Sequence, residues 1–469
     1  MHRRVLIVLL GGALLLGGCS LAPTYQAPEA PVPANWPQGE SYAEAPAGPE
    51  APAVAELQWE DFFADEKLKK VIRMALENNR DLRLAALNVE RARALYGIQR
   101  AELYPAVNAA GAYAKVRRSA DLISTGEPRT VEQYSVDLGV AAWEIDFFGR
   151  LRNLKHQALE TYLATEEARR SAQILLVAEV SKAYLALAAD RENLALARST
   201  LETQQETYDL IQKSFKNGMA TEIDLRRSQT QVDGARRDVH RNLQLTAQAK
   251  NALDLLAGTP VSAELLPADL ANVTPPKTLS PGLSSEALLD RPDIMAAEHR
   301  LKGANAYIGA ARAAFFPRIS LTAAVGTASD ELSGLFTSGT DTWSFAPSIA
   351  MPIFDARTWA ALRVSKAEQE IILTQYEKTV QAAFREVADA LALQGTINQQ
   401  VAAQQSLVDA AAETYRLSTR RYTVGIDNYL SVLDAHRALY LQRQVLILLQ
   451  LSGLANRVGL YAALGGGAV

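Results

Sequence analysis

The sequence predicts an α+β membrane protein that combines very long helices with short alternating strands. Residues 150–217 contain neither glycine nor proline. As one helix they would extend roughly 100 Å at about 1.5 Å per residue, whereas helices of compact domains average about 11–12 residues. In addition, four segments of about ten residues alternate between apolar and small polar side chains, which is typical of strands. A third observation is that this arrangement occurs twice along the chain.

The N-terminus predicts export and a lipid anchor. Arg3 and Arg4 precede a short apolar stretch, which gives a secretory signal peptide over 1–18 that is too short to span a membrane. The residues LGGCS resemble the bacterial lipobox, in which Cys19 becomes the first residue and carries N-acyl and S-diacylglycerol groups. A plain signal peptide with an incidental thiol is the alternative. Resemblance to lipoproteins, with serine at position 20, predicts sorting to the outer membrane.

Charge and cysteine content exclude several classes of protein. The formal charge of −4 becomes −6 once the two signal-peptide arginines are removed, so nucleic acid is not expected as a partner. Cys19 is the only cysteine, so no intrachain disulfide can form.

No run of about 18 consecutive apolar residues follows the signal peptide, so no transmembrane helix is predicted. Deeper membrane contact must then come from strands.

The duplication appears as two sets of matching residues. Residues 81–105 match 293–317 at an offset of 212, and Glu179 matches Glu386 at an offset of 207 that continues to Gly258 and Gly465. Residues rich in proline and alanine precede the first copy and are expected to form an extended tether. The predicted organisation is a signal peptide at 1–18, a lipidated Pro/Ala-rich segment at 19–60, a first repeat at 61–258, a linker at 259–285 and a second repeat at 286–469.

Each repeat is predicted to contain a helix, two strands, a long helix, a turn and a returning helix. A heptad stripe from Val180 to Phe215 indicates packing along a neighbouring helix with left-handed supercoiling. In the first repeat the strands are expected at about 105–115 and 133–146, the long helix at 150–217 and the returning helix at 221–256. In the second repeat the strands are expected at about 317–327 and 343–354, the long helix at 358–424 and the returning helix at 427–464.

The strand pattern fits either a half-buried soluble sheet or a membrane barrel. Ile319, Leu321 and Val325 share one face, and the other face carries small polar residues as a water-filled lumen requires. Aromatic residues such as Trp343 and Phe354 gather at strand ends, which favours the barrel. Four strands cannot close a barrel, and lipid tolerates no open sheet edge, so several chains must share one barrel.

Signatures of catalysis are missing from the sequence. It contains no GxxxxGK[ST], HExxH, GxSxG or CxxC motif, so we predict no catalytic residue and no enzyme. His156, His240, His299 and His436 are scattered, and we predict that they are solvated or packed residues and not metal ligands. His240 and His436 are expected on polar helix faces.

The turns that follow the two long helices are the candidate functional sites. Gly218 and Gly425 are expected to end the long helices. Thr221 and Asp224 have the spacing of a capping box, and Asp427 or Asn428 is expected to cap the second returning helix.

Asp434 is not explained by capping, because it lies two turns inside the second returning helix. One interpretation is a functional carboxylate, and the alternative is an exposed side chain that pairs with Arg437. Several copies of one carboxylate, brought close to a symmetry axis, would repel one another, attract cations and exclude anions.

Motifs from Cys19 to Gly467 resemble the TolC family, specifically the OprM/OprJ group of NodT-type outer membrane factor lipoproteins. They include DRPDIMAAEH, IGAARAAFFPRISLTAAVGT, QAAFREVADALA and YTVGIDNYLSVLDAHRALY. The resemblance implies a homotrimer with a 12-stranded β-barrel, four strands per chain, continued by a long α-helical periplasmic barrel with a small mixed equatorial region. It also implies a periplasmic adaptor and an inner-membrane transporter of the resistance-nodulation-division type as partners.

The implied function is the outer-membrane exit duct of a tripartite efflux pump, passively exporting drugs or other small toxic compounds. It would be lipid-anchored in the outer membrane and extend into the periplasm. Alternatives are a lipid-anchored periplasmic coiled-coil scaffold, or the same duct serving metal efflux or type I secretion. The sequence has no ladder of Met or His residues that would suggest metal efflux.

The resemblance also assigns roles to single residues. Asp434 matches an acidic ring that narrows the periplasmic end, with Leu430 as an apolar ring one turn earlier. Tyr422 and Asp224 match positions that hold the aperture shut. Ser431 and Asp427 depart from the best-known relative, which has a second ring aspartate and a linking arginine there. The predicted adaptor contacts lie at the two turns, Gly218, Thr221, Gly425 and Asp427.

Overall fold

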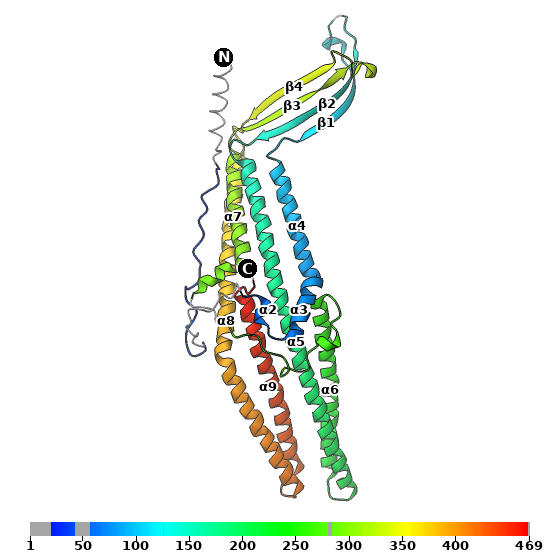
Figure 1. Ribbon diagram of the computed structural model, residues 1–469, viewed down its shortest axis with the longest axis vertical. Coiled ribbons are helices and arrows are strands. Elements are labelled where there is room, and N and C mark those ends of the chain that lie inside the picture. Colours follow the sequence, from blue (N-terminus) through cyan, green and yellow to red (C-terminus); the bar gives the residue numbers. More distant parts are fainter. Residues whose placement is uncertain (1–19, 43–56, 125, 280–283, 468–469) are drawn as a thin grey trace. The chain divides into compact units, whose positions relative to one another are not determined.

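A computed structural model describes residues 20–42, 57–124, 126–279 and 284–467. Apart from two short helices near the N-terminus, its helices and strands occur in the same order twice (Figure 1). The helices are α2 (Trp59–Phe62), α3 (Glu66–Asn78), α4 (Arg80–Ala101), α5 (Arg150–Lys216), α6 (Glu222–Ala257), α7 (Pro292–Ala313), α8 (Ala356–Thr423) and α9 (Tyr429–Ala463). The strands are β1 (Val107–Arg117), β2 (Thr130–Ile145), β3 (Arg318–Ser329) and β4 (Asp341–Ala350).

The chain divides into two compact units. Unit 1 takes its residues from 1–29, 88–166 and 296–376, and so contains the sheet and all of α7 except its first four residues. Unit 2 takes its residues from 30–87, 167–295 and 377–469, and so contains α6 and α9. The long helices α5 and α8, of 67 and 68 residues, contribute to both units.

The sheet of unit 1 has four antiparallel strands in the order β1-β2-β3-β4. The strands are 10 to 16 residues long, and about 9–11 tilted residues are enough to cross a bilayer. A bulge interrupts β2 between Val140 and Trp143, where Ala142 has a φ of 48° and donates its N–H to Thr322 Oγ1 at 3.0 Å. Within the described chain, β1 and β4 are open edges.

The register brings the apolar side chains of different strands onto one face. Leu138 pairs with Val325, which pairs with Trp343, and on the opposite face Asp137, Gly326 and Thr342 form the adjacent row. The apolar row is 52%, 61% and 80% exposed in the order Leu138, Val325, Trp343. A half-buried soluble sheet would cover such a face with its own core. The exposed apolar face therefore favours the membrane barrel over the soluble sheet.

Unit 2 is organised around one hydrophobic core. Phe62 of α2 stacks on Tyr461 of α9 with ring centroids 4.3 Å apart, and Tyr184 and Leu187 of α5 are almost fully buried in the same cluster. Residues of the linker, such as Leu270, also belong to it. The linker therefore packs onto the helices instead of crossing solvent.

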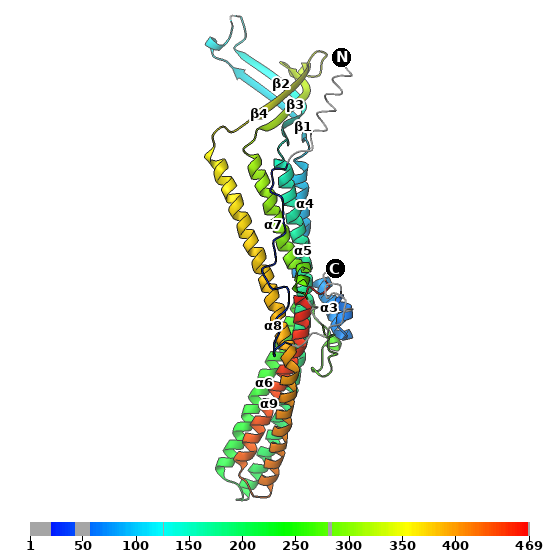
Figure 2. The same cartoon turned by 90° about the vertical axis from the view of Figure 1, so that its left-hand side faces the viewer.

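The lower parts of α5 and α8 pack with α6 and α9 into a bundle whose two turns lie at the same end (Figure 2).

Among the described residues, α5 and α9 each contain an 18-residue window long and apolar enough to cross a membrane. In α5, 61% of that window is buried, so core packing explains its composition, whereas in α9 only 22% is buried. The expectation that no such helix follows the signal peptide overlooked these windows, because polar residues interrupt both.

The described part of the Pro/Ala-rich segment is not a free tether, contrary to the sequence-based expectation. In unit 2, Trp36 is buried and stacks on Phe384 with ring centroids 5.2 Å apart, and Ser285 donates its hydroxyl hydrogen to the Pro33 carbonyl at 2.6 Å. In unit 1, Tyr25 donates its phenolic hydrogen to Glu298 at 3.0 Å. Two aromatic anchors therefore hold the segment on the helices.

The duplication is visible in matching contacts of unit 2. Asn79, just before α4, donates its side-chain N–H to the Leu256 carbonyl at the end of α6 at 2.9 Å. At the equivalent position of the second repeat, Arg291 donates to the Ala463 carbonyl at the end of α9 at 2.6 Å. Each repeat thus ties the start of its first helix to the end of its last one, which satisfies a free helix-end carbonyl.

Candidate functional site

Both turns at the end of the bundle are built in the same way. Gly218 and Gly425 have φ values of 75° and 76°, in the left-handed region that only glycine adopts without strain. The following residues close the helix ends, with Met219 N–H donating to the Ser214 carbonyl and Ile426 N–H to the Arg421 carbonyl, each at 2.9 Å. These are Schellman-type ends. The turns are therefore fixed in shape by the sequence, as a docking surface requires.

At the first turn, Thr221 and Asp224 form the expected capping box. The Asp224 N–H donates to Thr221 Oγ1 at 3.2 Å, and the Thr221 hydroxyl donates to the Asp224 carboxylate at 2.6 Å. The Asp224 charge also reaches Tyr422, because burial and then Asp224 raise the pKa of that phenol. Asp224 therefore has a structural role in α6 and an electrostatic one toward α8.

At the second turn, Asn428 and not Asp427 caps the returning helix. Asn428 Oδ1 accepts from the Ser431 N–H at 3.4 Å. Asp427 instead receives two hydrogen bonds from Arg421, at 2.6 and 3.0 Å, which lower the pKa of its carboxyl group. This ion pair closes the turn, since it joins the end of α8 to the residue before the cap.

Tyr422 lies against an apolar cluster just inside the turns. Its ring centroid is 5.4 Å from that of Tyr429, and both rings belong to or pack on a cluster with Ile211, Val432 and Leu433. The cluster joins α5, α8 and α9 of one chain. Tyr422 is thus placed where it can stabilise the closed packing of these helices.

Leu430 and Asp434 occupy the opposite, uncovered face of α9. They are four residues apart, so they lie one above the other on one side of the helix. The Asp434 side chain is 65% exposed, and its nearest cation is Arg437 at 3.9 Å. Arg437 also donates to Gln231 at 3.2 Å. The carboxylate therefore keeps most of its surface free.

The histidines of the described residues are packed or solvated, and no group there of three or more His, Cys, Asp or Glu residues could hold a metal ion. The Glu160 carboxylate lies 2.7 Å from His299 Nδ1 and 3.3 Å from His156 Nε2. His436 was expected on a polar helix face, and this was wrong. It lies between helices, with Nδ1 2.9 Å from the buried Gln204 of α5 and its ring edge-on to Tyr415 at 5.0 Å.

His436 should make the turn end of the bundle sensitive to acid. Burial, with Arg443 as the second cause, lowers the pKa of His436 below its ordinary 6.5. Below about pH 6.5 the unfolded chain therefore binds a proton that the folded chain resists, so the free energy of unfolding falls as the pH drops. We expect His436→Gln to weaken this loss, measured by thermal unfolding between pH 7.5 and 5. The matched control is His240→Gln, at an exposed site on α6. Equal acid sensitivity of wild type and His436→Gln would contradict the prediction.

Sequence inspection missed two features. The contacts of residues 20–25 with unit 1 join positions far apart in the chain, so no local pattern reveals them. Arg291 lies within the motif DRPDIMAAEH and is buried at a junction of three helices, a role that the motif itself does not indicate. A lone arginine beside Pro292 at a helix start was the available signal. The predicted lipidation site, Cys19, lies outside the described residues.

The exposed apolar sheet with open edges, joined to helices of 67 and 68 residues, defines a membrane-channel protomer. Comparison with known proteins specifies which kind. The model of the family described as outer membrane efflux protein matches residues 71–259 and 283–466. The chain therefore belongs to the outer membrane efflux protein family, and the two matches confirm the internal duplication.

Relatives and a solved structure agree with this assignment. The chain is 48% identical over 456 residues to ArpC, an antibiotic efflux pump outer membrane protein of Pseudomonas putida, covering 97% of this chain and 94% of ArpC. It is 43% identical to outer membrane protein OprJ of Pseudomonas aeruginosa, covering 97% and 94%. The open-state MtrE outer membrane channel of Neisseria gonorrhoeae matches with a TM-score of 0.84 and 38% identity, covering 96% and 99%. The predicted TolC-family resemblance, fold class and efflux-channel function are confirmed.

Proposed function

We propose that three copies of this chain form one closed channel that serves as the exit duct of a tripartite efflux pump. The observation that carries the proposal is the exposed apolar face of a sheet with two open edges. Such a sheet is stable in lipid only when other strands close it. Pairing β4 of one copy with β1 of the next closes a barrel of twelve strands.

The helices next to the open edges support the same arrangement. None of the residues of α4, which leads into β1, is buried, and Leu95 and Ile98 are exposed. On α8, which follows β4, Val364 and Ile371 are exposed too. Leu95 and Ile98 are three residues apart, and Val364 and Ile371 are seven residues apart. Each pair therefore forms an apolar stripe on one side of its helix. In the trimer, α4 of one copy would pack beside α8 of the next.

The partners and cargo follow from the class of pump. ArpC is named for antibiotic efflux, and we propose drugs or similar small toxic compounds as cargo here as well. An inner-membrane transporter of the resistance-nodulation-division type would drive export, and a periplasmic adaptor would bind the turns at Gly218, Thr221, Gly425 and Asp427. The protein would lie in the outer membrane and extend into the periplasm, and we propose no catalytic role for it.

The anchor and the gate complete the proposal. Cys19 would carry acyl and diacylglycerol groups that hold the N-terminus in the outer membrane. Leu430 and Asp434 would form the closed aperture, because they share the uncovered face of α9. Asp224 and Tyr422 would stabilise the closed state through the cluster beside the turns.

Planar-bilayer recording and gel migration of the purified protein test the channel. We expect a trimer that dissociates on heating and conducts ions in discrete steps. A periplasmic scaffold would need the long helices but neither property. Unheated protein that migrates as a monomer and leaves the bilayer silent would therefore refute the proposal.

A further inference from the structure

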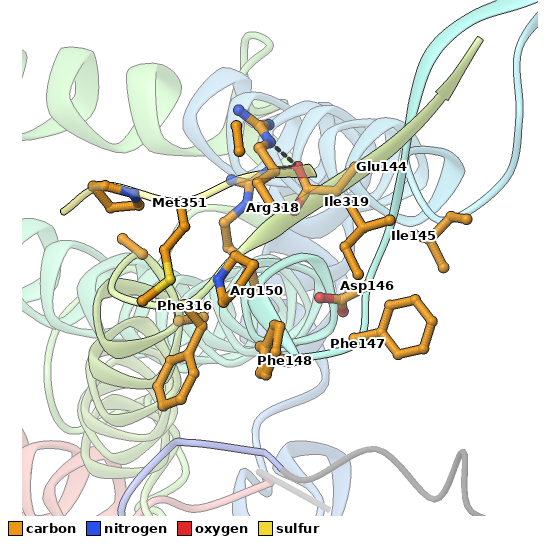
Figure 3. A pocket seen from close by; sticks show the side chains of 15 residues that line it. Glu144, Ile145, Asp146, Phe147, Phe148, Arg150, Phe316, Arg318, Ile319 and Met351 are labelled. Carbon is orange, nitrogen blue, oxygen red and sulfur yellow. Dashed lines mark hydrogen bonds and ion pairs between the residues drawn. The ribbon is translucent and has the colours of Figure 1, made fainter. Parts of the chain in front are cut away.

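A cavity of about 530 Å³ lies in unit 1 where the ends of the strands meet the first residues of α5 and the last residues of α7 (Figure 3). Its volume is within the range of about 300–1,000 Å³ that is typical of small-molecule sites. Phe148 and Phe316 stack there with ring centroids 4.9 Å apart, and Ile319 and Met351 also line the cavity. The apolar part is therefore suited to a hydrocarbon chain.

The polar part of the cavity supplies hydrogen-bond donors. Arg150 makes two hydrogen bonds of 2.8 Å to the Glu144 carboxylate, and Arg318 pairs with the same carboxylate. Two guanidinium groups thus share one acceptor. Since each guanidinium has five N–H donors and no acceptor, donors remain for ester or carbonyl oxygens at the mouth of the cavity.

The N-terminal segment follows a track that leads toward this cavity. From residue 25 back to residue 20, the contact partners move along α7 toward its C-terminal end, and the last partner lies in the first turn of α5. Tyr25 donates to Glu298 at 3.0 Å, Asn305 donates to the Pro23 carbonyl at 2.8 Å, Arg312 donates to the Leu21 carbonyl at 3.0 Å, and Ser20 donates to Asn153 at 2.9 Å.

Gly309 allows the segment to lie directly on α7. A Cβ at this position would come within 2.7 Å of the Ala22 nitrogen and 2.6 Å of Asn153 Nδ2. Any larger residue would therefore push the segment off its track. Because Ala22 packs this closely on Gly309, the first described residues, from Ser20 onward, follow one defined path along α7.

Ser20 contacts a residue that is less than one helical turn from Arg150, which lines the cavity. Asn153, its partner, is three residues after Arg150, about 4.5 Å along the helix axis, and Arg150 lines the cavity. One more residue adds about 3.8 Å of backbone. If the mature chain begins at Cys19, as proposed above, only that residue separates Ser20 from the attached lipid.

We propose that the cavity is an intramolecular seat for the lipid on Cys19. An acyl chain lies among Phe148, Phe316 and Met351, and its ester oxygens accept from Arg318. The track along α7 favours this occupant over a free phospholipid, because the track ends at Ser20 beside Asn153 and the next residue in the sequence is Cys19. The inference rests on the proposed lipidation.

Photo-crosslinking in cells tests the seat. Cells are fed a diazirine palmitate with a terminal alkyne, irradiated, and the purified full-length protein is digested for mass spectrometry. We expect the acylated N-terminal peptide to be linked to peptides of the same chain that contain Phe148, Phe316 or Met351. Ala314 also lines the cavity, so Ala314→Trp should fill the cavity and abolish these links while leaving acylation intact. Ala110→Trp, on the polar face of β1, should retain them.

The remaining outcomes separate the two proposals. Links found only outside the cavity, with the N-terminal peptide fully acylated, would overturn the seat and leave the anchor standing. Cys19→Ser, exported by a signal peptide without a lipobox, should lose the cavity links. If it keeps them, the occupant is a free lipid and the seat for Cys19 is refuted. An N-terminal peptide whose mass shows no acyl groups would overturn the anchor and the seat together.

Discussion

Replacing Arg291 by alanine is expected to destabilise unit 2 by about 3 kcal/mol, the lower end of the cost of breaking a buried ion pair. Arg291 is buried and donates to Asp293 at 2.7 and 3.0 Å, to Glu386 at 3.1 and 3.2 Å and to the Ala463 carbonyl at 2.6 Å. The variant would leave all three acceptors without their donor. The lower end applies because Glu386 is half exposed and water can solvate it.

Thermal unfolding followed by circular dichroism in detergent measures this effect. Arg291→Lys is the matched control, because it keeps the charge but loses the planar fork that reaches several acceptors at once. We expect the lysine variant to unfold between wild type and Arg291→Ala. Asn79→Ala removes the equivalent but uncharged tie of the first repeat and should cost less. An unchanged unfolding temperature for Arg291→Ala would show that the three-helix junction does not depend on this side chain.

The long helices and the strands could be predicted from sequence because their signals are local. Uninterrupted helix formers allow α5 to continue for 67 residues, and Gly218 then ends it through its own backbone conformation. The strict alternation around Leu138 and Val325 assigned those residues to one face, and the register confirms it. Local propensity and pattern suffice where each residue's neighbours in sequence decide its state.

Features set by contacts between distant residues could not be predicted in the same way. His436 was placed on a polar face because only its own helix was considered, yet Gln204 of α5 and Tyr415 of α8 surround it. The tether expectation failed similarly, because Trp36 needs Phe384, far along the chain, to become an anchor. At the second turn the sequence offers no reason to choose between Asp427 and Asn428 as the cap. The structure decides, because Asp427 pairs with Arg421 and leaves the cap to Asn428. The gate residues stay a prediction, since one chain does not contain a threefold axis.

Replacing Leu430 and Asp434 together by alanine is expected to raise the single-channel conductance severalfold. In the proposed trimer the two residues would supply three apolar side chains and three carboxylates to one aperture, and alanine would remove the carboxylates and most of the apolar volume. Asp434 has no strong partner to hold it elsewhere, because Arg437 lies 3.9 Å away and both side chains are more than half exposed. Its loss should therefore change the pore more than the fold.

The single variants separate steric from electrostatic control of the aperture. Asp434→Asn keeps the size of the side chain but removes its charge, so we expect lower cation selectivity at nearly unchanged conductance. Leu430→Ala should widen the opening and retain selectivity. Asp409→Ala, at an exposed carboxylate on α8, serves as the control and should change neither property. If the double variant conducts like wild type in planar bilayers, the narrowest part of the channel lies elsewhere, and the uncovered face of α9 does not form the gate.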